Sequence, residues 1–155
     1  MANLKYLRAA LVAVGLIFIF GIYTLTIVWP SGWSWHTGGH SDYLQMILGV
    51  YATLGVFLLL AARDPLANLS LIWFTVWSSV VHAAIMGVQS LVNTHNMPHL
   101  WGDVSALFIV AGILAALTRG AQASSKESGL SSVGSAAPRQ SRFVGESVRA
   151  TRTGT

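Results

Sequence analysis

The chain is 155 residues long, of which 54% are hydrophobic and only 9% are charged. Soluble domains carry about 25% charged residues, so this composition excludes an ordinary soluble protein. The formal net charge of +4 lies entirely in residues 119–155, and such a basic, solvated tail gives no indication of nucleic-acid binding. Cysteine is absent, which excludes disulfides, thiolate metal ligands, cysteine nucleophiles and iron–sulfur clusters.

The first apolar segment, Tyr6–Trp29, predicts a transmembrane helix. Its interior, Ala9–Val28, is 20 residues long and uncharged, and a bilayer core needs about 20 apolar helical residues. A cleaved signal peptide is the alternative. However, signal peptides have an apolar region of only about 7–15 residues followed by a small-residue cleavage site, and this segment is longer and has no such site after it. Trp29, Trp33 and Trp35 follow, as is typical of the membrane interface. We therefore expect a retained span that ends in an aromatic belt.

The loop after this span, residues 30–42, contains histidine but neither Lys nor Arg. The loop at residues 93–99 has the same character, and each loop spaces two histidines by four residues. Imidazole and carboxylate groups are common metal donors, which makes a candidate metal site of His36, His40, His95, His99 and Asp103. Glycines and a proline interrupt the two histidine pairs, so the alternatives are histidines merely tolerated at the interface or a proton-linked role.

The second apolar segment, Tyr43–Ala62, predicts a span that ends at a sharp turn. Arg63 and Asp64 precede Pro65, which disfavours helical geometry at the residue before it and lacks a backbone donor. Asn68 is the expected N-cap of the next helix. Spans two and three should therefore form an antiparallel hairpin.

The third apolar segment, Leu69–Val92, carries two stripes at helical spacing. One is polar and contains Ser78, His82, Met86 and Gln89. The other contains small residues, Ser79, Ala83 and Gly87, which let membrane helices approach closely. Helix three is therefore expected at the centre of the bundle.

His82 is the most informative polar residue, because ionisable groups inside a span are costly and often functional. At about 1.5 Å rise per residue, His82 and Tyr51 of the second span lie at similar depths. The candidate cofactor-binding residues are His82, Met86, Tyr51 and Gln89. The alternative is a neutral His82 whose hydrogen bond to Tyr51, to Ser78 or to a backbone carbonyl holds two helices together.

The fourth apolar segment, Leu100–Thr118, completes the spans, and residues 119–155 are rich in Ser, Ala, Gly and Arg. Such a tail cannot bury enough apolar surface to offset its ordering entropy, which predicts disorder. All Lys and Arg fall on one side of a four-span arrangement, which places both termini in the cytoplasm. The predicted fold class is therefore all-α, an integral membrane four-helix bundle with a disordered cytoplasmic C-terminal tail.

Three stretches carry a resemblance: residues 29–33 (WPSGW), residues 46–65 (MILGVYATLGVFLLLAARDP) and residues 70–89 (SLIWFTVWSSVVHAAIMGVQ). Together they resemble small uncharacterised bacterial four-helix membrane proteins, and the layout is similar to the DoxX-like class. The resemblance covers about residues 6–118 and implies a bacterial inner membrane. DoxX-like proteins are associated with quinone-linked redox complexes, but no site motif matches residue by residue.

Three classes of function are compatible with this pattern. The first is a non-enzymatic membrane protein, either an accessory or assembly subunit or a small ligand-binding bundle, because the chain shows no catalytic motif. The second is a redox protein that uses His82 and the outer histidines to bind a metal, haem or quinone. The third is a transporter, which the uninterrupted spans disfavour. The expected partners are the lipid bilayer and either other membrane subunits or a second copy, without nucleic acid, and the sequence identifies no cofactor.

Overall fold

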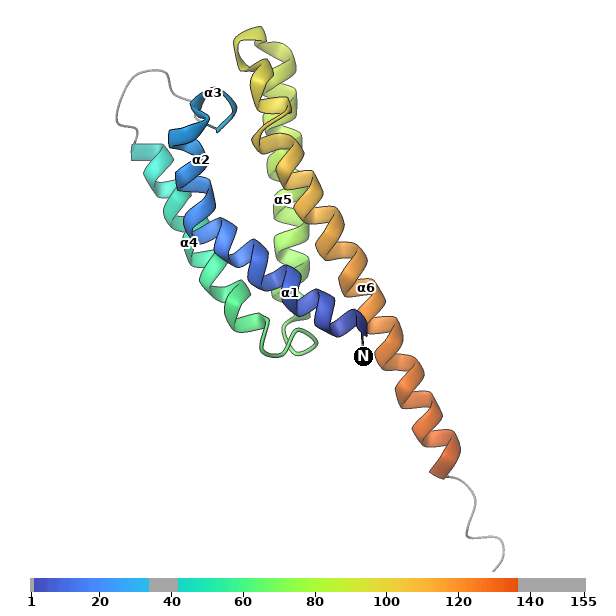
Figure 1. The fold of residues 1–155 in the computed structure, drawn as a ribbon. Coiled ribbons are helices and arrows are strands. Elements are labelled where there is room, and N and C mark those ends of the chain that lie inside the picture. The colour runs from blue at the N-terminus through green and yellow to red at the C-terminus, as the bar shows by residue number, and fades with distance from the viewer. Residues whose placement is uncertain (1, 34–41, 137–155) are drawn as a thin grey trace, which may run out of the picture. The chain divides into compact units, whose positions relative to one another are not determined.

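The computed structural model describes residues 2–33 and 42–136, and their regular structure is entirely helical. The elements in chain order are α1 (Ala2–Leu16), the π-helical η1 (Ile17–Gly21), α2 (Ile22–Val28), α3 (Pro30–Trp33), α4 (Asp42–Ala61), α5 (Leu69–Val92), the 3-10 helix η2 (Thr94–Leu100) and α6 (Asp103–Ala136) (Figure 1). Within this part of the chain, four stretches are long and apolar enough to cross a membrane: Asn3–Val28, Asp42–Ala61, Leu69–Val92 and Asn96–Glu127.

The first span is one continuous rod made of α1, η1 and α2. Its middle turn is π-helical from Ile17 to Gly21, and such turns often occur beside functional sites. The rod ends at Val28, because Pro30 disfavours helical geometry at Trp29, whose φ is −135° and ψ is 67°. The aromatic residues that follow the first span therefore start a new short helix, α3.

The hairpin between α4 and α5 closes as predicted, but Asn68 does not cap α5 with its side chain. Asn68 occupies the N-cap position, and its Nδ2 donates backwards to the carbonyl oxygen of Asp64 at 2.8 Å. The Asp64 carboxylate in turn accepts the backbone N–H of Ala67 at 3.3 Å. The predicted cap is therefore wrong, since the amide stabilises the turn and not the first turn of the helix.

The helices α1 and α4 cross at a pair of glycines. A methyl group added at Gly55 would lie 2.7 Å from the carbonyl oxygen of Gly15, and one at Gly15 would lie 2.9 Å from that of Gly55. Two backbones come this close only where neither residue has a side chain. This contact brings the first rod against α4.

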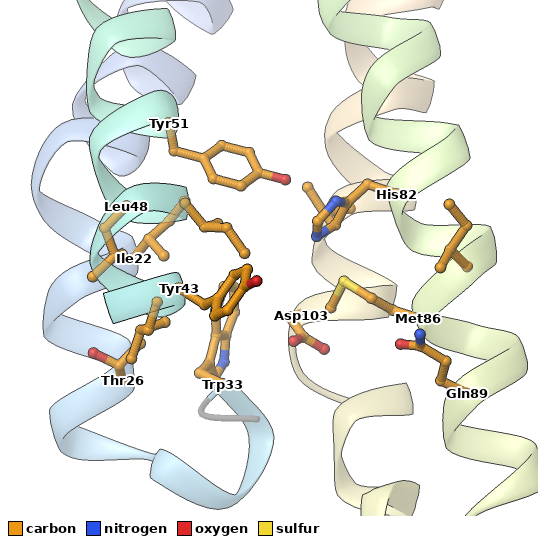
Figure 2. Close-up of a pocket in the computed structure, with 14 residues that line it drawn as sticks. Ile22, Thr26, Trp33, Tyr43, Leu48, Tyr51, His82, Met86, Gln89 and Asp103 are labelled. Atoms are coloured by element: carbon orange, nitrogen blue, oxygen red, sulfur yellow. The ribbon is translucent and has the colours of Figure 1, made fainter. Parts of the chain in front are cut away.

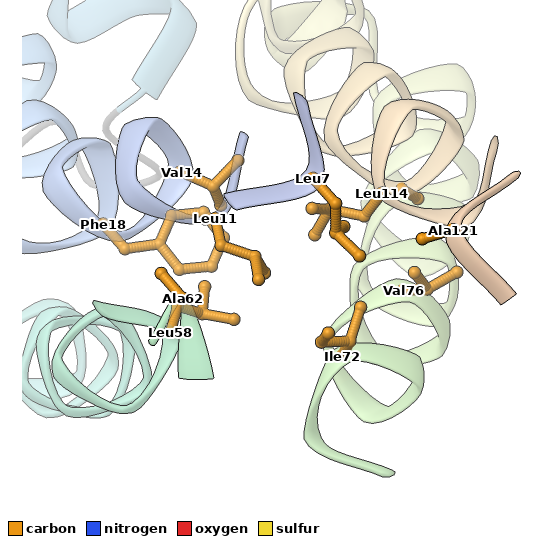
Figure 3. Close-up of a cluster of buried hydrophobic side chains, with 11 residues drawn as sticks. Leu7, Leu11, Val14, Phe18, Leu58, Ala62, Ile72, Val76, Leu114 and Ala121 are labelled. Carbon is orange, nitrogen blue, oxygen red and sulfur yellow. The ribbon is translucent and has the colours of Figure 1, made fainter. Parts of the chain in front are cut away.

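A large apolar cluster joins all four spans at one end of the bundle (Figure 3). Leu7 and Leu11 of α1 meet Leu58 of α4, Ile72 of α5 and Leu114 of α6, and all five are fully buried. Asn3 Nδ2 also donates to the Gly120 carbonyl at 3.3 Å, and the Arg119 guanidinium lies 5.6 Å from the centre of the Trp73 ring. Lys5, Arg8, Arg63 and Arg119 therefore lie at the same end, which we call the basic end.

A smaller cluster joins α5 to α6 nearer the other end. Ala83 and Met86 of α5 pack against Val104 and Leu107 of α6. Ser79 and Ala83, both from the stripe of small residues, are buried. A methyl group at Gly87 would meet Val104 at 3.7 Å. The small stripe therefore lies on the face of α5 that packs against α6.

The helix α6 continues to Ala136, although the sequence predicts that this helix ends at Thr118. Residues 119–136 include Ala, Gln, Lys and Glu, which favour helix, and the next proline is Pro138. The glycines and serines in this stretch lower its helical propensity, but no proline removes a helical hydrogen bond before Pro138. Residues up to Gln122 belong to one compact unit and those from Ala123 to a second. The disorder predicted for the rest of the tail, residues 137–155, concerns residues outside the described part.

Candidate functional site

A pocket of about 390 Å³ lies in the half of the first unit away from the basic end, and we call it the α4–α6 pocket (Figure 2). Residues from α2, α3 and α4 form one wall, and residues from α5 and α6 form the other. The lining residues are Ile22, Thr26, Trp33, Tyr43, Leu44, Ile47, Leu48, Tyr51, His82, Ile85, Met86, Gln89, Asp103 and Leu107. Most of this surface is apolar, with a few polar groups directed into it, which is the usual character of a small-molecule site.

Three aromatic rings connect η1, α4 and α5 at the inner end of the pocket. The Phe18 ring, in the π-helical turn, lies edge-on to the Tyr51 ring with centroids 5.0 Å apart. The Tyr51 ring lies edge-on to the His82 imidazole with centroids 5.9 Å apart. The predicted proximity of Tyr51 and His82 is therefore confirmed, and it takes the form of a ring contact.

A second hollow of about 310 Å³ lies on the other side of this contact. The two hollows share Tyr43, Ile47, Tyr51 and His82 as lining residues. Ser78 lines the second hollow, and its hydroxyl donates to the Thr75 carbonyl at 3.2 Å within the same helix. The polar stripe of α5 thus faces both hollows.

A buried histidine–aspartate contact lies where η2 meets α6. His99 Nδ1 and Asp103 Oδ2 are 3.1 Å apart, and the two side chains are only 4% and 8% exposed. A histidine that donates Nδ1–H to a carboxylate orients both groups. Asp103 also lines the α4–α6 pocket, so the pair places a carboxylate at the pocket wall from the first turn of α6.

The candidate cofactor residues His82, Met86, Tyr51 and Gln89 all line the α4–α6 pocket. Among the residues that the structure describes, no group of three or more His, Asp or Glu side chains is close enough to bind a metal ion. Of the candidate metal ligands, the structure joins His99 to Asp103. His36, His40 and the side chain of His95 lie outside the described part. The predicted metal site and the cofactor role of His82 stay predictions.

A match to a family of unknown function, DUF6632, covers residues 1–134. The chain belongs to this family. No curated protein and no solved structure matches it. The DUF6632 match therefore covers the four candidate spans and the whole α4–α6 pocket, and it assigns no activity to them. The bacterial origin and the DoxX-like layout that the sequence resemblance implies stay predictions.

Sequence reasoning did not assign Trp33, Tyr43 and Thr26 to the site of this DUF6632 protein, although all three line its pocket. Trp33 is interpreted from the sequence as part of an aromatic belt, and the other two carry no spacing signal. The pairing of His99 with Asp103 has a signal, because the two residues are four apart across the start of a helix. The sequence also spaces His95 and His99 by four residues, and this spacing favoured the pairing of His99 with His95 over the pairing with Asp103.

Proposed function

We propose that this protein is a non-enzymatic multi-pass membrane protein that binds a small, largely apolar ligand in the α4–α6 pocket. The observation that carries the proposal is an apolar pocket with a small set of polar groups at defined positions, Tyr51, His82, Gln89 and Asp103. Its volume of about 390 Å³ falls within the roughly 300–1,000 Å³ typical of ligand pockets.

Membrane insertion is supported by the side chains on the outside of the helices. Phe20, Val50, Trp77 and Leu91 are each at least 60% exposed, and each comes from the middle or end of an apolar stretch. A soluble helix would carry a charged stripe at such positions. In contact with lipid chains, these side chains avoid the free-energy cost of exposing apolar surface to water. The bilayer is therefore the expected surroundings of the four helices.

An orientation with both termini in the cytoplasm is supported by the basic end. Lys5, Arg8, Arg63 and Arg119 lie there, and the described residues around η2 and α3 carry no Lys or Arg. Cytoplasmic loops are rich in these residues because positively charged segments are retained on that side of the membrane. The α4–α6 pocket then lies in the outer half of the bilayer.

The route into the pocket is supported by the exposure of lining side chains on α4 and α5, which include Ile85 of α5 at 54%. Tyr43 and Ile47 line it from α4 and are 77% and 43% exposed. In a bilayer these side chains face lipid, so an amphiphilic molecule dissolved in the membrane reaches the pocket without crossing water. The polar groups at the far wall then orient its head.

A pocket-filling substitution tests the proposal. Ile47→Trp adds an indole at the wall that both hollows share, and it should abolish retention of any small molecule that copurifies with the wild-type protein. Native mass spectrometry of protein released from mild detergent measures this as loss of the ligand-bound mass.

The matched control is Val56→Trp on the same helix. Val56 is 48% exposed, close to the 43% of Ile47, and lines neither hollow. This variant should retain the ligand-bound mass. Equal loss in both variants, or a wild-type protein without bound mass even after incubation with amphiphiles, would overturn the proposal.

A further inference from the structure

The α4–α6 pocket combines aromatic rings on one wall with a carboxylate on the other. Trp33 comes from α3 and Tyr43 from the first turn of α4, and Asp103 comes from the first turn of α6. Figure 2 shows the two rings on the α4 side of the space and the Asp103 carboxylate facing it from the α6 side. Two successive helices, α3 and α4, and the distant α6 thus supply the polar end of one pocket.

The charge of the lining favours a cation. Among the residues that the structure describes, the pocket lining contains one carboxylate, Asp103, and neither Lys nor Arg. The Lys and Arg residues that the structure describes in the first unit lie at its opposite end. The Asp103 carboxylate, with His99 Nδ1 3.1 Å from its Oδ2, is buried in surroundings of low polarity, where a carboxylate strongly attracts an opposite charge.

The aromatic rings favour a particular kind of cation. Organic ammonium ions bind over the faces of tryptophan and tyrosine rings, because the ring quadrupole is negative there and the methyl groups of the ion pack against the ring. An anionic head would meet Asp103 with no Lys or Arg of the lining to pair with it.

We propose that the ligand of this pocket is a lipophilic ammonium ion. Its cationic head lies between the Trp33 and Tyr43 rings and the Asp103 carboxylate. Its apolar tail lies along the aliphatic part of the lining, which includes Ile22, Leu48 and Leu107. This inference rests on the proposed function and adds the charge and the chemical class of the ligand to it.

The test compares three probes that share one tail, with the protein in nanodiscs of zwitterionic lipid and empty nanodiscs as background. The probes are octyltrimethylammonium, its uncharged isostere with a tert-butyl head, and octyl sulfonate. We expect calorimetric titration to show the ammonium probe binding at least about tenfold more tightly than the other two, as one strong charge interaction allows. Equal affinity for the three probes, or tighter binding of the sulfonate, would overturn the ammonium assignment and leave the proposed function standing. Binding of none of them would overturn both.

Two substitutions locate the cationic head. Asp103→Asn should weaken ammonium binding by about tenfold and leave the affinity for the tert-butyl probe unchanged, whereas Asp64→Asn at the basic end should change neither. Asp103 is buried, so Trp33→Leu gives a second measurement that does not depend on folding of the Asn variant. It should also weaken ammonium binding selectively, and Trp101→Leu, which removes an indole that is 82% exposed outside the pocket, should not. Unchanged selectivity in Trp33→Leu would contradict the proposed position of the head.

Discussion

At the scale of single residues, the most constrained position is Gly55, where α4 meets the first rod. A Cβ there would lie 2.7 Å from a backbone oxygen of Gly15 and 2.8 Å from Cγ1 of Ile19. Backbone cannot rotate aside as a flexible side chain does, so the helices must separate. We expect Gly55→Ala to lower the free energy of unfolding by about 1–3 kcal/mol, measured by thermal unfolding in mild detergent.

Gly49 provides the control for this prediction on the same helix. A Cβ there meets nothing within 4 Å, so Gly49→Ala should leave stability unchanged or raise it slightly, as alanine favours helix over glycine. If the two variants unfold at the same temperature, the crossing of α1 and α4 is not held by the glycine pair.

At the scale of elements, the packing of α5 on α6 sets the far wall of the α4–α6 pocket. Ala83 is fully buried against Val104 and Leu107. It directly follows His82 and lies three residues before Met86, both of which line the pocket. We expect Ala83→Leu to force the two helices apart and to cost about 1–3 kcal/mol of stability. The same substitution at the exposed neighbour Ala84 should be tolerated. Denaturation in detergent measures both, and equal stability of the two variants would show that α5 meets α6 on another face.

At the scale of the whole molecule, the prediction concerns orientation in the membrane, and the absence of cysteine makes it directly testable. Ser31 in α3 and Ala67 in the α4–α5 turn are both exposed, and they lie at opposite ends of the spans. A membrane-impermeant maleimide should label Ser31→Cys in intact cells. It should label Ala67→Cys only after the membrane is opened. The reverse pattern would place the termini outside.

Much of the fold follows from local properties of the chain. The α5 helix covers Leu69–Val92, the same residues as the predicted third span, because its apolar run and its turn residues are both local signals. The end of α6 was less predictable. A Ser- and Ala-rich segment can be either helix or coil. Composition alone does not decide which, because the entropy lost when the segment becomes ordered is similar in size to the free energy gained from helix formation.

The candidate site divides in the same way. The sequence alone determined the polar stripe with His82, Met86 and Gln89, since helical periodicity places those residues on one face. It also determined that Tyr51 lies at the depth of His82, because the rise per residue is constant. Only the tertiary structure brought Trp33, Tyr43 and Asp103 to one pocket. These residues come from three helices, and the distances between them depend on how the helices cross. Side-chain packing between helices and close glycine contacts set those crossings. The spacing of residues within one segment does not contain that information.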